Sequence, residues 1–274
     1  MKKRSVIFLI AAAALALALL AGYMVYERTA ASPGCPVISF ESDMISVTTD
    51  ATDEELLKGV TATDPEDGDV SDLLMVESVS NIVSGNVAKV SYVAFDSKNH
   101  MTRAQRMVKY TDYESPKFAM THPMVFRASA TNNLLTYITA EDMFDGDISR
   151  KVIYTIVSDT TTLANRGEYD VELRVVNSMG DLSKLKIPVE ITDNETNPAD
   201  IQLKEYLVYI DKNSEFNPDD YFVSQSPNGT PSTNMSGIRV ESDVDTSEAG
   251  VYSVTYSCGS GNSASHTRLL VVVE

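Results

Sequence analysis

The sequence contains no tryptophan, and only two cysteines and three histidines occur among its 274 residues. Two cysteines cannot build a disulfide scaffold or a structural zinc site. Positive charge is also scarce, because 22 Lys and Arg stand against 39 Asp and Glu, for a net charge of −17 at pH 7. Such a surface repels phosphate backbones, so the sequence excludes nucleic acid as a partner.

Residue patterns typical of enzymes are missing as well. The three histidines, His100, His122 and His266, are far apart in the chain, and none accompanies a serine and an acid in a recognisable order. The patterns H-E-x-x-H and G-x-S-x-G and the P-loop do not occur in the sequence. We therefore expect a protein without enzymatic activity.

One long apolar run is present, at the N-terminus. Three basic residues at 2–4 precede residues 6–26, which contain no charged residue and no proline. As a helix, this run matches a hydrocarbon core of about 30 Å, and the basic flank is expected to stay in the cytoplasm. We predict a cytoplasmic N-terminus (1–5), a transmembrane signal anchor (6–26) and a stalk (27–36). A cleaved signal peptide is the alternative.

The rest of the chain repeats a pattern of strands. The run EDGDVS at 66–71 recurs 78 residues later as FDGDIS at 144–149. In residues 169–175, apolar side chains alternate with Asp, Glu and Arg, and the runs 90–94 and 252–258 alternate in the same way. Alternation with a period of two predicts antiparallel strands that are buried on one face.

Two polar linkers that end in proline, at 111–116 and 192–198, separate the repeats. We predict an all-β fold in which one N-terminal transmembrane helix precedes three tandem β-sandwich domains, 37–112, 113–193 and 194–274. The three domains are expected to be extracytoplasmic, in a protein that crosses the cell membrane once.

The motifs resemble one family of domains. The run GVTATDPEDGDVS, followed by a G-x-Y-x-V-x-Y strand and an Asp-Ser or Asn-Ser turn, is similar to bacterial Ig-like domains of the variety named after pesticidal crystal proteins. These modules occur in tandem on bacterial surface proteins, and the resemblance covers roughly residues 36–274. The third copy departs from it, because FVSQS at 222–226 replaces the acidic turn.

The acidic turns are the candidate site. In an Ig-like strand order they lie at the end where the chain enters each domain, beside the turns that begin at Asp96 and Asn177. Carboxylates that converge at a domain junction could bind calcium, which takes six to eight oxygen ligands. The candidate ligands are Asp67, Asp69, Asp145, Asp147, Asp112 and Glu114. The alternative is structural, because Asp-Gly also makes a tight turn. We expect no other cofactor.

Two tyrosines and the two cysteines are assigned structural roles. Tyr169 and Tyr252 occupy the position of the tyrosine corner of Ig-like sandwiches, in which the hydroxyl binds nearby backbone. Cys258 is predicted to point into a core, and Cys35 lies in the stalk. A disulfide needs Cα atoms within about 7 Å, so domains stacked end to end would not form one within the chain. Cys35 is then either free or joined to a second chain.

Together these features predict a non-enzymatic, membrane-anchored bacterial cell-surface protein. Its domains would form an adhesion or interaction rod that binds another surface protein or a cell-wall polymer through the loop 225–236. The alternative is a structural spacer or envelope component, stiffened by calcium at the domain junctions. The membrane, reached through the N-terminal helix, is the other expected partner.

Overall fold

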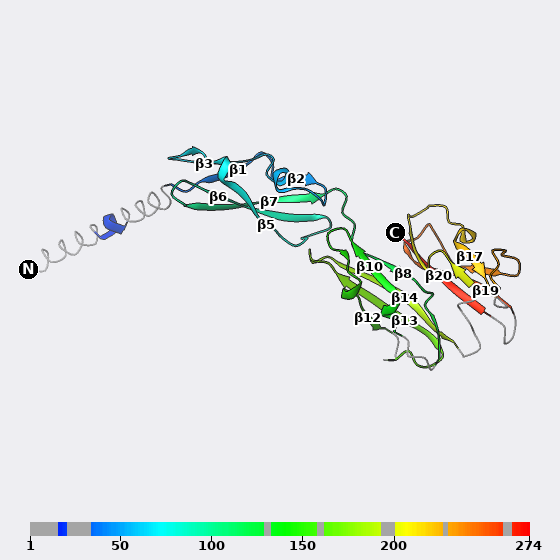
Figure 1. Ribbon diagram of the computed structural model, residues 1–274. Helices are drawn as coiled ribbons and strands as arrows, with labels where there is room; N and C mark the ends of the chain where they lie inside the picture. The colour runs from blue at the N-terminus through cyan, green and yellow to red at the C-terminus, as the bar shows by residue number, and fades with distance from the viewer. Residues whose placement is uncertain are drawn as a thin grey trace, which may run out of the picture. The chain divides into compact units, whose positions relative to one another are not determined.

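The structure is a computed structural model (Figure 1). It describes residues 16–20, 34–128, 133–157, 162–192, 201–226, 230–259 and 265–274. The fold is all-β, as predicted. The chain divides into two compact units, Met1–Asp112 and Tyr113–Glu274.

The predicted membrane anchor, 6–26, lies largely outside the described residues. Residues 16–20 are described, and they are helical. No helix within the described part of the chain is both long enough and apolar enough to span a bilayer. The predicted cytoplasmic residues, 1–5, and most of the stalk also lie outside the described residues.

The first unit contains one β-sandwich. Its strands are β1 (Val37–Phe40), β2 (Met44–Val47), β3 (Val60–Asp64), β4 (Gly68–Asp69), β5 (Leu74–Val79), β6 (Val87–Phe95) and β7 (Met101–Tyr110). They form a three-stranded sheet in the order β1-β3-β4 and a four-stranded sheet in the order β2-β7-β6-β5. One helical turn, α2 (Asp53–Leu56), joins the sheets, and a 3-10 turn, η1 (Ser71–Leu73), precedes β5.

The second unit contains two further sandwiches. The strands of the second sandwich are β8 (Lys117–Met120), β9 (Val125–Arg127), β10 (Ile138–Asp142), β11 (Gly146–Asp147), β12 (Ile153–Ile156), β13 (Gly167–Val176) and β14 (Leu182–Thr192). The strands of the third are β15 (Ile201–Leu203), β16 (Leu207–Ile210), β17 (Phe222–Gln225), β18 (Arg239–Ser242), β19 (Gly250–Cys258) and β20 (Ser265–Val273). The 3-10 turns are η2 (Leu134–Thr136), η3 (Ser149–Lys151) and η5 (Pro218–Tyr221).

The three sandwiches share one strand order, except that the described residues of the third contain no counterpart of β4 and β11. In the second, the sheets run β11-β10-β8 and β12-β13-β14-β9, and in the third, β15-β17 and β16-β20-β19-β18. The first strand of each sandwich is split between its two sheets, and its second half pairs in parallel with the last strand. These parallel pairs are β2 with β7, β9 with β14, and β16 with β20. The structure therefore repeats three times, as the sequence does.

The alternation of apolar residues determines which faces are buried. In β13, Tyr169, Val171, Leu173 and Val175 are all at most 9% exposed, whereas Asp170 between them is exposed. Most of the equivalent residues of β6 and β19 are also buried, among them Tyr92 and Tyr256 of the first and third sandwiches, whereas Tyr252 is only partly buried. Each side chain that the period of two assigned to a core in β13 is thus buried.

One core contains a buried cation that the sequence did not indicate. Arg106 of β7 is only 4% exposed, and its guanidinium donates to the carbonyl oxygens of Leu56 (2.6 Å) and Lys58 (2.7 Å). It also donates to the Tyr92 hydroxyl at 2.9 Å, and lies over the rings of Phe40 and Tyr92. Arg106 therefore caps the C-terminal end of α2 from inside the core.

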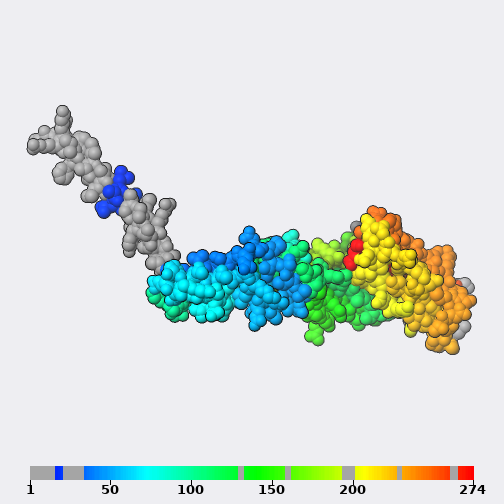
Figure 2. All heavy atoms as spheres, turned by 90° about the horizontal axis from the view of Figure 1, so that it is seen from above, coloured from blue at the N-terminus to red at the C-terminus, as the bar shows by residue number. Residues whose placement is uncertain are grey.

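The second and third sandwiches pack against each other. Side chains on the outward face of β16 and β20, Leu207 and Leu270, are 5% and 2% exposed and belong to the core cluster of the second sandwich. At one end of β20, Arg268 contacts Glu168 at 2.7 Å and Glu190 at 3.3 Å. At its other end, Glu274 contacts Lys117 at 3.0 Å. Figure 2 shows the red C-terminal residues at the border between the green and the yellow atoms.

These two domains are consequently not separate links of a rod stacked end to end. The strand β20 lies along the second sandwich, because contacts to β8, β13 and β14 are distributed from one end of β20 to the other. The outward residues of β20 are apolar at Leu270 and Val272, so both faces of this strand are covered. An apolar face that would otherwise meet water is the physical reason for the lateral packing.

Both tyrosine corners are present. The Tyr169 hydroxyl donates to the Asn165 carbonyl at 2.7 Å, and the Tyr252 hydroxyl donates to the Glu248 carbonyl at 3.0 Å. Cys258 is buried in the third core, as predicted, and neither it nor Cys35 takes part in a disulfide.

Candidate functional site: the acidic turns

The acidic turn of the first sandwich is a hairpin between β3 and β4. Asp64, the last residue of β3, is 5% exposed, and its Oδ1 accepts hydrogen bonds from the backbone N–H of Glu66 (2.8 Å) and Asp67 (3.0 Å). Gly68 completes the turn with φ of 79°, a left-handed conformation that glycine adopts without strain. Asp64 therefore closes the turn, a role that the sequence analysis did not assign to it.

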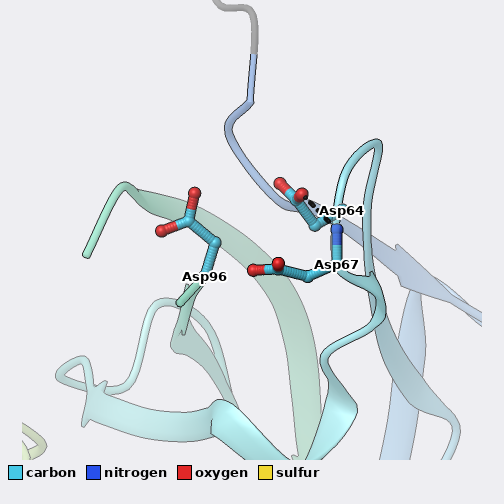
Figure 3. A group of neighbouring side chains, drawn as sticks. All are labelled: Asp64, Asp67 and Asp96. Atoms are coloured by element: carbon cyan, nitrogen blue, oxygen red, sulfur yellow. Dashed lines mark hydrogen bonds between the residues drawn. The ribbon is translucent and has the colours of Figure 1, made fainter. Parts of the chain in front are cut away.

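The hairpin is attached to the turn between β6 and β7. The Asp67 carboxylate accepts hydrogen bonds from the backbone N–H (2.7 Å) and the hydroxyl (3.0 Å) of Ser97. Asp96, beside Ser97, is 5% exposed, and its Oδ1 accepts from the backbone N–H of Lys98 and His100. Ligand oxygens of Asp64, Asp67 and Asp96 all lie within 4.8 Å of one another (Figure 3).

The second sandwich repeats this arrangement. Asp142 Oδ1 accepts from the backbone N–H of Phe144 (2.9 Å) and Asp145 (3.0 Å), as Asp64 does in the first sandwich. Asp145 accepts from the backbone N–H of Ser178 at 2.8 Å and from its hydroxyl, as Asp67 does from Ser97. The structural reading of the Asp-Gly turns thus accounts for the hydrogen bonds in both copies.

Asp69 and Asp147, the last acids of the two turns, have a separate role. Their Oδ1 atoms accept from the backbone N–H of Ser71 (3.0 Å) and Ser149 (2.9 Å), at the start of η1 and η3. Hydrogen bonds from the serine side chain and backbone hold the pKa of each carboxyl below its usual value. Both side chains cap the turn that follows them, and neither belongs to the group formed by Asp64, Asp67 and Asp96.

The two linker acids are bound within their own units. Asp112 accepts from the backbone N–H of Thr49 at 2.9 Å and from its hydroxyl at 3.1 Å, in the first unit. Glu114 contacts the Lys117 ammonium at 2.7 Å, in the second unit. The six calcium candidates that the sequence indicated therefore divide among several local structural roles.

The two copies differ at one decisive position. Asp96 of the first sandwich corresponds to Asn177 of the second, which is 4% exposed. The Asn177 amide donates to Asp142 Oδ2 at 2.8 Å and to the Tyr113 hydroxyl at 2.9 Å. Burial, and then the hydrogen bond to Asp181, raise the pKa of Tyr113 well above its usual value, so its hydroxyl keeps its proton.

At the first copy, a histidine lies at the rim. His100 Nδ1 lies 2.6 Å from Asp96 Oδ2 and 2.9 Å from the Gly34 carbonyl oxygen. The hydrogen bond to Asp96 raises the pKa of His100. Burial raises the pKa of Asp96, but hydrogen bonds from His100 and Lys98 outweigh it, and this pKa lies below its usual value. The arrangement gathers negative charge at a place where one side chain, Asp67, is exposed.

Comparisons with known proteins identify no family. No protein-family model matches the chain, and no curated protein matches it. Among solved structures, the CBM51-2 (in complex with GlcNAc) and INT domains of Clostridium perfringens ZmpB are 18% identical, cover 55% of this chain and 26% of that one, and have a TM-score of 0.23. The Protocadherin GammaB4 extracellular domain is 12% identical, over 88% and 49% of the two chains, with a TM-score of 0.21.

Mouse Cadherin-23 EC22-24 is 13% identical over 88% of this chain and 99% of that one, with a TM-score of 0.21. The chain therefore spans only a part of the ZmpB and protocadherin structures. None of them indicates the pesticidal crystal protein variety.

Proposed function

We propose that this protein is a non-enzymatic, membrane-anchored protein of a bacterial surface, and that its Ig-like domains are of the pesticidal crystal protein variety. The predicted helix at 6–26 would hold it in the membrane, with the sandwiches outside the cell. Its partner is another surface protein or a cell-wall polymer. The strongly acidic composition, 39 acids against 22 bases, supports a soluble body that repels other anionic surfaces.

The observation that carries this proposal is how the described residues of the loop 225–236, namely 225–226 and 230–236, are anchored in the third sandwich. Gln225 is 6% exposed, and its amide donates to the carbonyl oxygens of Asn234 (2.6 Å) and Ser236 (3.0 Å). Its backbone exchanges two hydrogen bonds with Ser232. Thr230 and Thr233, between these anchors, are exposed. A loop that is exposed but fixed at its base loses less conformational entropy on binding than a free loop.

A spacer or envelope component is the second candidate. The lateral packing of the second and third sandwiches favours it, because Leu207 and Leu270 join them into one stiff unit. In this case the loop has no partner, and the domains serve to separate the membrane from other components.

Crosslinking on intact cells, followed by mass spectrometry, distinguishes the two candidates. The test variant is Thr230→Lys with Thr233→Lys, which keeps the Gln225 anchor. The matched control is Arg239→Ala with Glu241→Ala, which removes an exposed ion pair from the same sandwich. The interaction function predicts that the loop variant loses a crosslinked partner that the control retains. Identical crosslinks from both variants would favour the spacer, and absence from the membrane fraction would contradict the anchor.

A further inference from the structure

The carboxylates of Asp64, Asp67 and Asp96 lie around one small space at the end of the first sandwich. Asp64 comes from the end of β3, Asp67 from the β3–β4 hairpin and Asp96 from the β6–β7 turn (Figure 3). Ligand oxygens of the three lie within 4.8 Å of one another. Two oxygens bound to one calcium ion at about 2.4 Å are at most about 4.8 Å apart, so the spacing of the three is compatible with one ion.

One oxygen of this group is buried and has no partner. Asp64 is 5% exposed, and its Oδ2 accepts no hydrogen bond from any described residue. The other oxygen, Oδ1, is held by the two N–H groups of the hairpin, which fixes the direction of the carboxylate. A buried carboxylate oxygen without a donor is unfavourable, because folding has removed its water and supplied nothing in exchange.

In the second sandwich, the equivalent carboxylate oxygen has a hydrogen-bond donor within the protein. Asp142, the counterpart of Asp64, receives a hydrogen bond on Oδ2 from the Asn177 amide at 2.8 Å. In the first sandwich Asp96 replaces that amide by a carboxylate, which has no proton to donate when it is ionised. Two ionised carboxylates that face each other repel, so a cation bound between them stabilises both charges.

Neither basic group near the space donates to the Asp64 oxygen that lacks a donor. Lys98, in the β6–β7 turn, forms an ion pair with Glu66. His100 contacts Asp96 Oδ2 at 2.6 Å but makes no hydrogen bond to Asp64 or Asp67 in the described structure. The oxygen of Asp64 that lacks a donor is therefore left for a ligand that enters from the exposed side, next to Asp67.

We propose that Asp64, Asp67 and Asp96 form a calcium site in the first sandwich, and that Asn177 takes the place of the ion in the second. Calcium fits this donor set better than magnesium, because it accepts irregular arrangements of carboxylate oxygens and completes its six to eight ligands with water. The site differs from the one that the sequence indicated. It keeps Asp67, adds the buried acids Asp64 and Asp96, and does not use Asp69 or the linker acids.

Calorimetric titration of the full-length protein with calcium chloride tests the proposal, together with amide hydrogen exchange with and without calcium. We expect one ion per chain, with a Kd of about 0.1–1 mM, as in other extracellular modules. Calcium should slow exchange in the β3–β4 hairpin and the β6–β7 turn, and leave the equivalent turns of the second sandwich unchanged.

The decisive variant is Asp96→Asn, because it copies the arrangement at Asn177 and so keeps the fold. It should weaken calcium binding at least about tenfold, through the loss of a charged ligand. Asp69→Asn is the matched control, since it removes the same charge from the adjacent β3–β4 hairpin, outside the proposed ligand set, and should bind as the wild type does. The proposal is overturned if about 10 mM calcium gives no binding heat and no slowing of amide exchange. It is also overturned if magnesium slows exchange as much as calcium does, or if Asp96→Asn binds calcium as tightly as the wild type.

Discussion

The buried guanidinium of Arg106 provides the sharpest test of how the first sandwich is held together. Replacement by methionine keeps most of the volume and removes the charge. The Lys58 carbonyl then loses its donor, and the Leu56 carbonyl retains only the Tyr92 hydroxyl, at 2.7 Å. Hydrogen bonds from a charged group contribute about 1.5–3 kcal/mol each, and relief of the desolvated charge offsets part of their loss. We expect Arg106→Met to destabilise the first unit by about 2–4 kcal/mol.

Hydrogen exchange in the full-length protein measures this loss within the first unit alone. The slowest amides of β6 and β7 exchange through unfolding of the sandwich, so a loss of this size speeds them roughly 30- to 800-fold. Arg103→Met is the control, because Arg103 lies on the same strand and forms an exposed ion pair with Glu77 at 2.7 Å. Such pairs contribute about 0–1 kcal/mol. If Arg106→Met exchanges no faster than Arg103→Met, the capping role assigned to Arg106 is wrong.

Three further outcomes are expected. Leu270→Ala should speed exchange in both β14 and β20, with a loss of about 2–5 kcal/mol, whereas Leu269→Ala should act on the third sandwich alone, because Leu269 belongs only to that core. The hydrogen bond from His266 lowers the pKa of Glu190 below 4.5, so this contact stabilises the second unit above that pH and loses its effect as the pH falls through the folded-state value. Glu190→Gln should therefore flatten the acid limb of a thermal melting profile, and an unchanged limb would contradict the assignment. Tyr169→Phe should lower the midpoint of urea unfolding by the equivalent of about 1 kcal/mol, since it removes the donor to the Asn165 carbonyl.

Much of the fold is readable from the sequence because strands buried on one face impose a period of two. The alternation around Val171 and Leu173 identified the inward residues of β13, and the repeated acidic turn marked the repeat itself. The split first strand was harder to foresee. Its two halves, β1 and β2, have four residues each and are partly exposed along their length, so neither has a strong pattern.

The lateral packing of the second and third sandwiches did leave a signal in the sequence. Residues 269–273 read LLVVV, which is apolar at every position and not at every second one. A strand that is apolar on both faces is covered on both faces. The period of two that the repeats share identifies only the inward face of each strand. The outward face of β20 is covered by the second sandwich, as the contacts of Leu207 and Leu270 show.

The calcium site depended on a comparison between copies that spacing alone does not provide. The sequence indicated the acids of the Asp-Gly-Asp turns and of the first linker, because the turns contain the recognisable motif. Asp64 and Asp142 occur at the same place in both copies and looked equivalent. Their environments differ because Asp96 and Asn177, about thirty residues further on, lie opposite them, and only the folded chain shows that these pairs meet.

The parallel pairing of β2 with β7 has a mechanical consequence. Met44–Val47 lies in register beside Met107–Tyr110, so the strand near the beginning of the sandwich runs alongside the strand that ends it. A force that pulls β2 and β7 from opposite ends of the domain would act along both strands and would load all the hydrogen bonds between them at the same time. In an antiparallel hairpin pulled at its two ends, the hydrogen bonds would instead break one after another. Each sandwich contains such a pair, so each is built to resist being pulled apart along the chain.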